Sequence, residues 1–312
     1  MTSFNRFLFL IVAFLNTYLV SAQIVSCDNL PFEELNFYDN ITYKNEKGKT
    51  VFVEEFAHLE NIVIESIYYK SDSLKIKGFI MRPKEIKRFP LIIFNRGGNR
   101  TYGELTPNIL VYNLSYLVSK GYTVAGSTYR GSKFSEGEDE FGGNDINDVV
   151  ELIKCLKKES YIDSNKLALY GWSRGGIMTY KTLQRIGGNS GIKTAIVGGA
   201  PSNLIETIIE RPEMESKVFS KIIPNYENDK EYLLKERSVI FWVNELPKIP
   251  IMLIHGLKDD AVSVNQTIKL STKFLENDIP FKLIIFEDEK HNIYTNKKEL
   301  DIVIENWLSK YL

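Results

Sequence analysis

From Pro90 onward, short apolar segments alternate with segments of helical periodicity, and this alternation constrains the fold more than any other feature. The apolar segments lack internal alternation of polar and apolar residues, which is typical of strands buried on both faces. Repeated strand and helix units build a parallel sheet covered by helices on both sides. The expected strands are 91–94, 122–127, 166–171, 195–197, 251–254 and 281–286, and the expected helices are 105–119, 145–158, 174–186, 264–277 and 296–311.

The residues before Pro90 favour antiparallel pairing. After a polar stretch, strand-like runs lie at 50–54, 62–70 and 74–82. Only Ser71-Asp72-Ser73 separates the last two runs, which is typical of a hairpin.

The alternation pauses between Pro201 and Pro247, where the sequence is charged and of helical character. In doubly wound sheets an insertion at such a place commonly lies over the carboxyl ends of the strands, where ligands bind. We therefore expect residues 204–236 to form a small helical lid. The sequence has no internal repeat and no Pro/Gly/Ser-rich linker, so residues 23–312 are expected to form a single domain.

Two helices carry boundary or face signals of their own. Ser263-Val264-Asn265-Gln266 matches a capping box, in which Ser263 and Gln266 satisfy amides of the first turn. The last helix places an apolar face toward the sheet, formed by Leu300, Val303, Ile304, Trp307, Leu308 and Tyr311.

The first 22 residues are predicted to be a secretory signal peptide. One basic residue, Arg6, precedes an apolar run over 7–20 that is shorter than the ~20 residues a membrane-spanning helix needs. Val20 and Ala22 suit signal peptidase, so cleavage after Ala22 is expected to leave a secreted or periplasmic protein without a membrane span. Two alternatives are an uncleaved N-terminal anchor and a lipid anchor on Cys27, because residues 24–27 are similar to a bacterial lipobox.

Charge and composition exclude several classes of function. The 39 basic and 40 acidic residues give no electrostatic basis for binding nucleic acid or an anionic membrane. Three histidines and two distant cysteines argue against a zinc site, and no metal or cofactor is expected. Cys155 lies in a helical pattern and is expected to be a buried thiol. A histidine-dependent mechanism has only His58, His255 and His291 to use.

Gly171-Trp172-Ser173-Arg174-Gly175-Gly176 follows an apolar strand and opens a helix. A strand, a sharp turn and a helix in this order are the context of a nucleophile elbow. Glycines flank the turn because it is too tight for side chains, and the serine hydroxyl is raised above the edge of the sheet. The sequence therefore predicts the α/β-hydrolase fold, a mostly parallel doubly wound sheet, with Ser173 as its nucleophile.

A serine hydroxyl needs a base within hydrogen-bond reach, and in α/β hydrolases the acid and then the histidine follow the serine along the chain. His255 ends an apolar strand and is expected to support the turn after it. His291 lies in a polar loop between the last strand and the last helix, so we predict His291 as the base. The two aspartates at 259 and 260 both follow a strand, and spacing alone leaves Asp259 and Asp260 open as the acid.

Five motifs extend this pattern along the chain: residues 171–176, Tyr129-Arg130-Gly131-Ser132, Gly142-Gly143-Asn144-Asp145-x-x-Asp148, His255-Gly256-x-x-Asp259-x-x-Val262 and Asp288-x-x-His291. Together they resemble the prolyl oligopeptidase family of serine peptidases, whose catalytic domain is an α/β hydrolase. The resemblance covers about residues 62–312. It implies Asp259 as the catalytic acid, and it implies that Arg130, Asp145 and Asp148 form an ion-pair scaffold beneath the site.

An oxyanion hole requires two donors. One is expected to be the backbone N–H of Arg174, which follows the nucleophile. The second is expected from Gly97 or Gly98, in the loop after the strand at 91–94. The family often has His-Gly-Gly-Pro here, whereas this chain has Arg96-Gly97-Gly98-Asn99. Arg96 is thereby a candidate substrate contact.

The sequence predicts a serine hydrolase that works through an acyl-enzyme, and the family resemblance implies small peptides as its substrates. Peptidases of the family usually carry an N-terminal β-propeller. Only about 40 residues precede the hairpin here, too few for such a propeller. A secreted carboxylesterase of the acetyl or feruloyl type is the alternative enzyme, and a non-catalytic binding protein on a hydrolase fold is the alternative outside enzymes. No oligomeric state is predicted.

Overall fold

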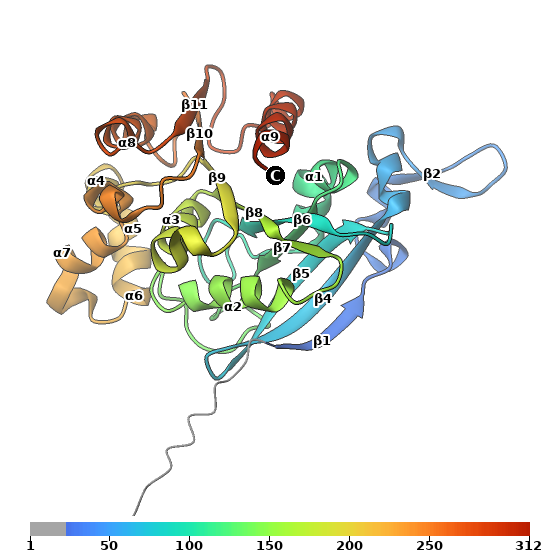
Figure 1. Ribbon diagram of the computed structural model, residues 1–312, viewed down its shortest axis with the longest axis horizontal. Helices are drawn as coiled ribbons and strands as arrows, with labels where there is room; N and C mark the ends of the chain where they lie inside the picture. Colours follow the sequence, from blue (N-terminus) through green and yellow to red (C-terminus); the bar gives the residue numbers. More distant parts are fainter. Residues whose placement is uncertain (1–22) are drawn as a thin grey trace, which may run out of the picture.

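The computed structural model describes residues 23–312, so the predicted signal peptide lies outside the described residues and stays a prediction. Its centre is a nine-stranded sheet in the order β1-β4-β5-β7-β6-β8-β9-β10-β11 (Figure 1). The strands of this sheet are β1 (Ile24–Asn29), β4 (Ile62–Ser71), β5 (Leu74–Pro83), β6 (Phe89–Asn95), β7 (Thr123–Ser127), β8 (Ile162–Trp172), β9 (Ile192–Gly198), β10 (Ile251–Gly256) and β11 (Phe281–Phe286).

The sheet is parallel from β7 to β11 and antiparallel at the other edge, where β1, β4 and β5 pair. The prediction of a mostly parallel α/β-hydrolase sheet is confirmed, and so is the hairpin of β4 and β5. The sequence analysis missed β1, which lies in the polar stretch before the first predicted strand. β1 is an edge strand with mostly exposed side chains, so backbone pairing with β4 forms it without an apolar pattern. A separate hairpin joins β2 (Thr42–Lys44) to β3 (Thr50–Phe52). The strand β3 is shorter than the predicted strand at 50–54.

Helices cover both faces of the sheet. Residues of α1 and α9 form a hydrophobic core with one face of the sheet. Residues of α2, α3 and α8 form a second core with the opposite face. The bounds are α1 (Pro107–Ser119), α2 (Ile146–Leu156), α3 (Arg174–Ile186), α8 (Val264–Glu276) and α9 (Lys297–Tyr311). The predicted face of α9 packs on the sheet, where the Trp307 indole donates a 2.7 Å hydrogen bond to Thr194.

The insertion at 204–236 is helical. It contains α4 (Leu204–Glu210), α5 (Pro212–Met214), a π-helical turn at Glu215–Phe219, α6 (Ser220–Ile222) and α7 (Tyr226–Glu236). These helices gather beside α3 (Figure 1), and a third apolar cluster joins Leu204, Phe219 and Leu234 to Ile177 of α3. Whether the insertion acts as a lid stays a prediction.

The capping box predicted before α8 is wrong in its second half. Ser263 does accept a hydrogen bond from the amide of Asn265. The buried Gln266 side chain turns away from the first turn and accepts hydrogen bonds from the backbone amides of Ser202 and Asn203, both at 3.0 Å. Gln266 thereby ties α8 to the start of the insertion, since those two amides precede α4.

Within residues 23–312, no helix is both long and apolar enough to cross a membrane. Both cysteines are free thiols: Cys27 is exposed on β1, and Cys155 is buried on α2 as expected. Burial raises the pKa of Cys155 to about 12, so this thiol is protonated at neutral pH as well as shielded.

The native protein should therefore react with a thiol reagent such as DTNB at one cysteine per chain, and at two after unfolding in urea. Cys27→Ser should abolish the reaction of the native protein. After unfolding in urea, this variant should show one reactive thiol, that of Cys155. Rapid native reaction of Cys155 in the Cys27→Ser variant would contradict the packing of α2 against the sheet.

Candidate active site

Ser173 lies at the turn between β8 and α3. Its backbone has φ 57° and ψ −127°, a conformation that residues other than glycine rarely adopt. Such a conformation costs of order 1–3 kcal/mol and is typical of functional turns. A Cβ atom at Gly175 would stand 1.8 Å from the Asn95 carbonyl oxygen, so only glycine fits there. Ser173 itself is partly exposed, as an elbow requires.

The acid and base predicted from the sequence lie together. His291 comes from the loop between β11 and α9, and its Nδ1 is 2.8 Å from Oδ2 of Asp259, in the loop after β10. His291 keeps 18% of its side chain exposed, whereas the Asp259 side chain is fully buried. Ser173 and His291 line the same cavity, and the three residues follow the carboxyl ends of β8, β10 and β11. Asp260 is exposed, near Lys290.

Asp259 is held by more than His291. Its Oδ1 accepts hydrogen bonds from the backbone amides of Ala261 and Val262. The Nε2 of the fully buried His255 lies 3.1 Å from its Oδ2. Burial acts to raise the pKa of Asp259, but the hydrogen bonds from His255 and His291 outweigh burial and bring the pKa well below its usual value. Asp259 is therefore an anion at neutral pH and can stabilise a positive charge on His291.

The sequence correctly expected His255 to support the turn after its strand, but it missed the contact of His255 with the acid. The His255 ring also lies 2.7 Å from the Thr267 hydroxyl and 2.9 Å from the Val262 carbonyl oxygen. A histidine four residues before an aspartate was the available signal.

Two side chains that sequence reasoning passed over fix the loop of His291. The buried Glu289 carboxylate accepts the amides of Tyr294 and Asn296, which shapes the loop just before α9. The Trp172 indole, one residue before the serine, donates a 3.0 Å hydrogen bond to the His291 carbonyl oxygen. The nucleophile turn and the histidine loop are thus directly connected.

The predicted oxyanion loop lies beside the serine. A Cβ atom at Gly97 would stand 3.1 Å from the Cβ of Ser173, and Gly98 has φ 69°. The amides of Gly97 and Gly98 donate no hydrogen bond among the described residues. Arg174 is the first residue of α3, so its N–H has no partner one turn earlier in the helix. Gly97 and Arg174 thus bring backbone amides without a described partner close to Ser173 from two elements.

Arg96 lines the cavity at Ser173, so its predicted contact with substrate stays a prediction, and the structure shows a structural role for it as well. Its side chain is buried, and its guanidinium nitrogens donate to the carbonyls of Gly97, Arg100, Tyr102 and Thr128 and to the Ser132 hydroxyl. These bonds use the donors of the guanidinium, so Arg96 holds the shape of the oxyanion loop. Burial and the nearby charge of Arg174 lower the pKa of Arg96 to about 10, which leaves it charged at neutral pH.

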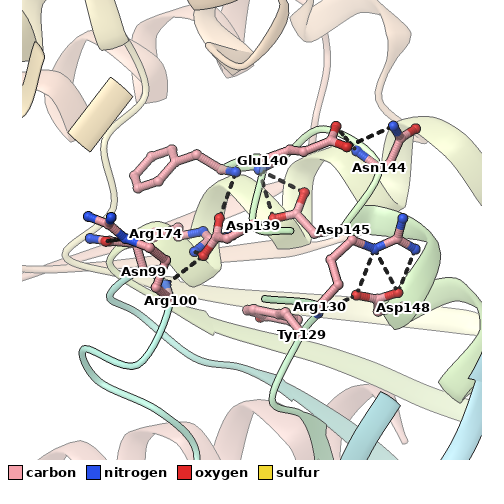
Figure 2. Close-up of polar contacts among 12 residues, drawn as sticks. Asn99, Arg100, Tyr129, Arg130, Asp139, Glu140, Asn144, Asp145, Asp148 and Arg174 are labelled. Atoms are coloured by element: carbon pink, nitrogen blue, oxygen red, sulfur yellow. Dashed lines mark hydrogen bonds and ion pairs between the residues drawn. The ribbon is translucent and has the colours of Figure 1, made fainter. Parts of the chain in front are cut away.

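Arg174 lies with its side chain buried between two carboxylates (Figure 2). One of its terminal nitrogens is 2.6 Å from Asp139 and also donates to the Gly98 carbonyl oxygen, and the other contacts Asp145. Asp139 in turn accepts the amide of Arg100 at 2.6 Å. One buried arginine thereby joins the residue after the nucleophile to the oxyanion loop.

The predicted scaffold ion pairs are present, although they form two groups. Asp145 pairs with Arg174, as described above, whereas Asp148 pairs with Arg130 at 2.7 Å (Figure 2). Arg130 also reaches Asp72, at the turn between β4 and β5. The sequence missed Asp139, whose acidic neighbourhood at 136–140 gives no sign of burial.

No cluster of His, Cys, Asp and Glu within residues 23–312 is arranged to hold a metal ion.

The family model described as the prolyl oligopeptidase family matches residues 109–312. The peptidase YtmA of Bacillus subtilis is 27% identical over 214 residues, which cover 69% of this chain and 80% of that protein. The acylaminoacyl peptidase of Pyrococcus horikoshii superposes with a TM-score of 0.68 at 19% identity, over 85% of this chain and 45% of that one. An acetyl xylan esterase from Paenibacillus sp. R4 gives a TM-score of 0.63 at 17% identity, over 81% and 85% of the two chains.

The sheet and the nucleophile elbow, with these likenesses, define an α/β-hydrolase that is a serine-type hydrolase. Within that class, the chain belongs to the prolyl oligopeptidase family. It spans less than half of the Pyrococcus horikoshii enzyme and most of YtmA.

Asp139→Asn should lower the free energy of unfolding by about 3 kcal/mol, because it leaves part of the buried Arg174 charge without a partner. Urea unfolding measures the loss. Asp72→Asn is the matched control: its carboxylate pairs with Arg130 from a side chain that is 48% exposed, so the loss should stay below about 1 kcal/mol. Equal losses in the two variants would show that Arg174 does not depend on Asp139.

Proposed function

We propose that Ser173, His291 and Asp259 are the catalytic triad of this hydrolase. Ser173 Oγ attacks the carbonyl carbon of the substrate while His291 Nε2 takes the hydroxyl proton. His291 then gives the proton to the leaving atom, the bond to the leaving group breaks, and an acyl-enzyme remains. Water repeats the sequence with His291 as base and releases the acid. The observation that carries the proposal is the 2.8 Å contact of His291 with Asp259 beside an elbow serine.

The oxyanion of each tetrahedral intermediate is assigned to the amides of Arg174 and Gly97. Gly97 is favoured over Gly98 because its backbone approaches the serine, whereas Gly98 serves the turn of the loop with its positive φ. Each such donor contributes about 3–4 kcal/mol to transition-state stabilisation.

Short peptides are the proposed substrates, since family membership and the likeness to YtmA both point to peptide bonds. An ester is the alternative. It is supported by the acetyl xylan esterase, of which this chain covers 85%, a nearly complete match in length.

A fluorophosphonate probe should label the purified protein once per chain at Ser173, and Ser173→Ala should remove the label. Mass spectrometry of the labelled peptide locates the site. A native protein that is not labelled would favour the non-catalytic binding protein. For the labelled enzyme, turnover of short peptide anilides against acetyl and feruloyl esters then decides between peptidase and esterase.

Asp259→Asn should lower kcat by roughly 10⁴-fold, because an amide cannot hold the required tautomer of His291 or stabilise its cation. Asp260→Asn is the matched control, one residue away with an exposed side chain, and should keep kcat within about twofold. A large loss in the Asp260 variant together with a small one in the Asp259 variant would reverse the assignment of the acid.

A further inference from the structure

A cavity of about 420 Å³ opens at Ser173 and His291 and extends between α1 and α9. This volume falls in the range of about 300–1,000 Å³ that is common for small-molecule sites. None of its lining residues belongs to the insertion at 204–236. The lining is mostly apolar and includes Phe94, Ile109, Leu114, Tyr170, Trp172 and Leu300.

Its floor is an aromatic surface built by the register of the sheet. Tyr170 and Trp172 are two residues apart on β8 and therefore point to the same face, and Phe94 is the partner of Tyr170 on β6. The ring centroids of Phe94 and Tyr170 are 5.4 Å apart, and those of Tyr170 and Trp172 are 6.4 Å apart. At the surface, Tyr102 and Tyr294 also line the cavity and are 78% and 75% exposed. A flat apolar ligand that enters this cavity can therefore pack against aromatic side chains along its whole length.

A hydrogen-bonding group lies at the inner end. Tyr170 as a residue is only 6% exposed and lines the cavity, and its hydroxyl makes no hydrogen bond to any residue that the structure describes. Burial, with the nearby Asp301 carboxylate, raises the pKa of Tyr170, so the hydroxyl keeps its proton and can donate. Asp301 and Lys297 form a salt bridge across one turn of α9, and both residues line the cavity. Since Tyr170 lines the cavity and its hydroxyl has no protein partner, a ligand that enters the cavity can supply the acceptor.

We propose that this cavity binds the leaving group of the substrate, and that the leaving group is an aromatic-sized apolar group with a hydrogen-bond acceptor at its far end. The assignment to the leaving group rests on the proposed function of Ser173 and His291. His291 must protonate the leaving atom, so the leaving group lies on the histidine side of the serine. His291 and the residues after it, Asn292 to Tyr294, form that side of the cavity. In a peptide the leaving group is the amine portion, and in an ester it is an alcohol or phenol.

The test uses acetyl esters with one acyl group and two leaving groups, methanol and 2-naphthol. Asn113→Trp fills the cavity from α1, where Asn113 is exposed and lines it. The ratio of kcat/KM for the naphthyl ester to that for the methyl ester should fall by roughly tenfold or more, as for other lost contacts in apolar pockets. Asn108→Trp is the matched control, an exposed asparagine on the same helix that does not line the cavity, and it should keep the ratio of the wild type.

An unchanged ratio in Asn113→Trp would overturn the proposal. It would also be overturned if the variant discriminated between acyl groups of different size at a constant leaving group, since the cavity would then hold the acyl part. A second measurement is independent of turnover: calorimetric titration of 2-naphthol into Ser173→Ala protein should show binding that Asn113→Trp weakens. Naphthol binding in a protein that fluorophosphonate does not label would contradict the triad alone, whereas labelling without naphthol binding would contradict the cavity alone.

Discussion

The buried charge of Arg174 is the constraint on which the rest of the site depends. A guanidinium in the protein interior requires carboxylate partners, and Asp139 and Asp145 supply them from the chain before α2. Because Arg174 directly follows the nucleophile, the two aspartates also fix the start of α3. Because the same guanidinium holds the Gly98 carbonyl and Asp139 holds the Arg100 amide, the oxyanion loop is fixed by the same charges.

The sequence could predict those parts of the fold that repeat a local physical pattern. Buried parallel strands are continuous apolar runs, so β6 to β11 and their helices were readable, and the glycines around Ser173 reported a turn without room for side chains. β1 was hard to predict because four of its six side chains are exposed and backbone pairing with β4, with one core contact from Ile24, holds it in place. The direction of Gln266 was likewise hidden, since its partners at Ser202 and Asn203 are distant in sequence.

The site shows the same division. The order of serine, acid and histidine along the chain was enough to predict His291 as the base, but it left Asp259 and Asp260 open as the acid. The family resemblance selected Asp259, which contacts His291 in the structure. The sequence did not reveal whether Arg96 points toward substrate or into the protein, because an arginine beside two glycines is compatible with both. The positions of five acceptors around its guanidinium show that the side chain is hydrogen-bonded within the protein.

Helix α9 both lines the cavity and packs in the core, which matters for changing the selectivity of the protein. Its first turns place Lys297 and Asp301 on the cavity wall, while Leu300, Ile304, Trp307 and Leu308 anchor it in the core. A small variant library confined to the amino-terminal end of this helix could therefore retune selectivity on a scaffold whose anchoring is left intact.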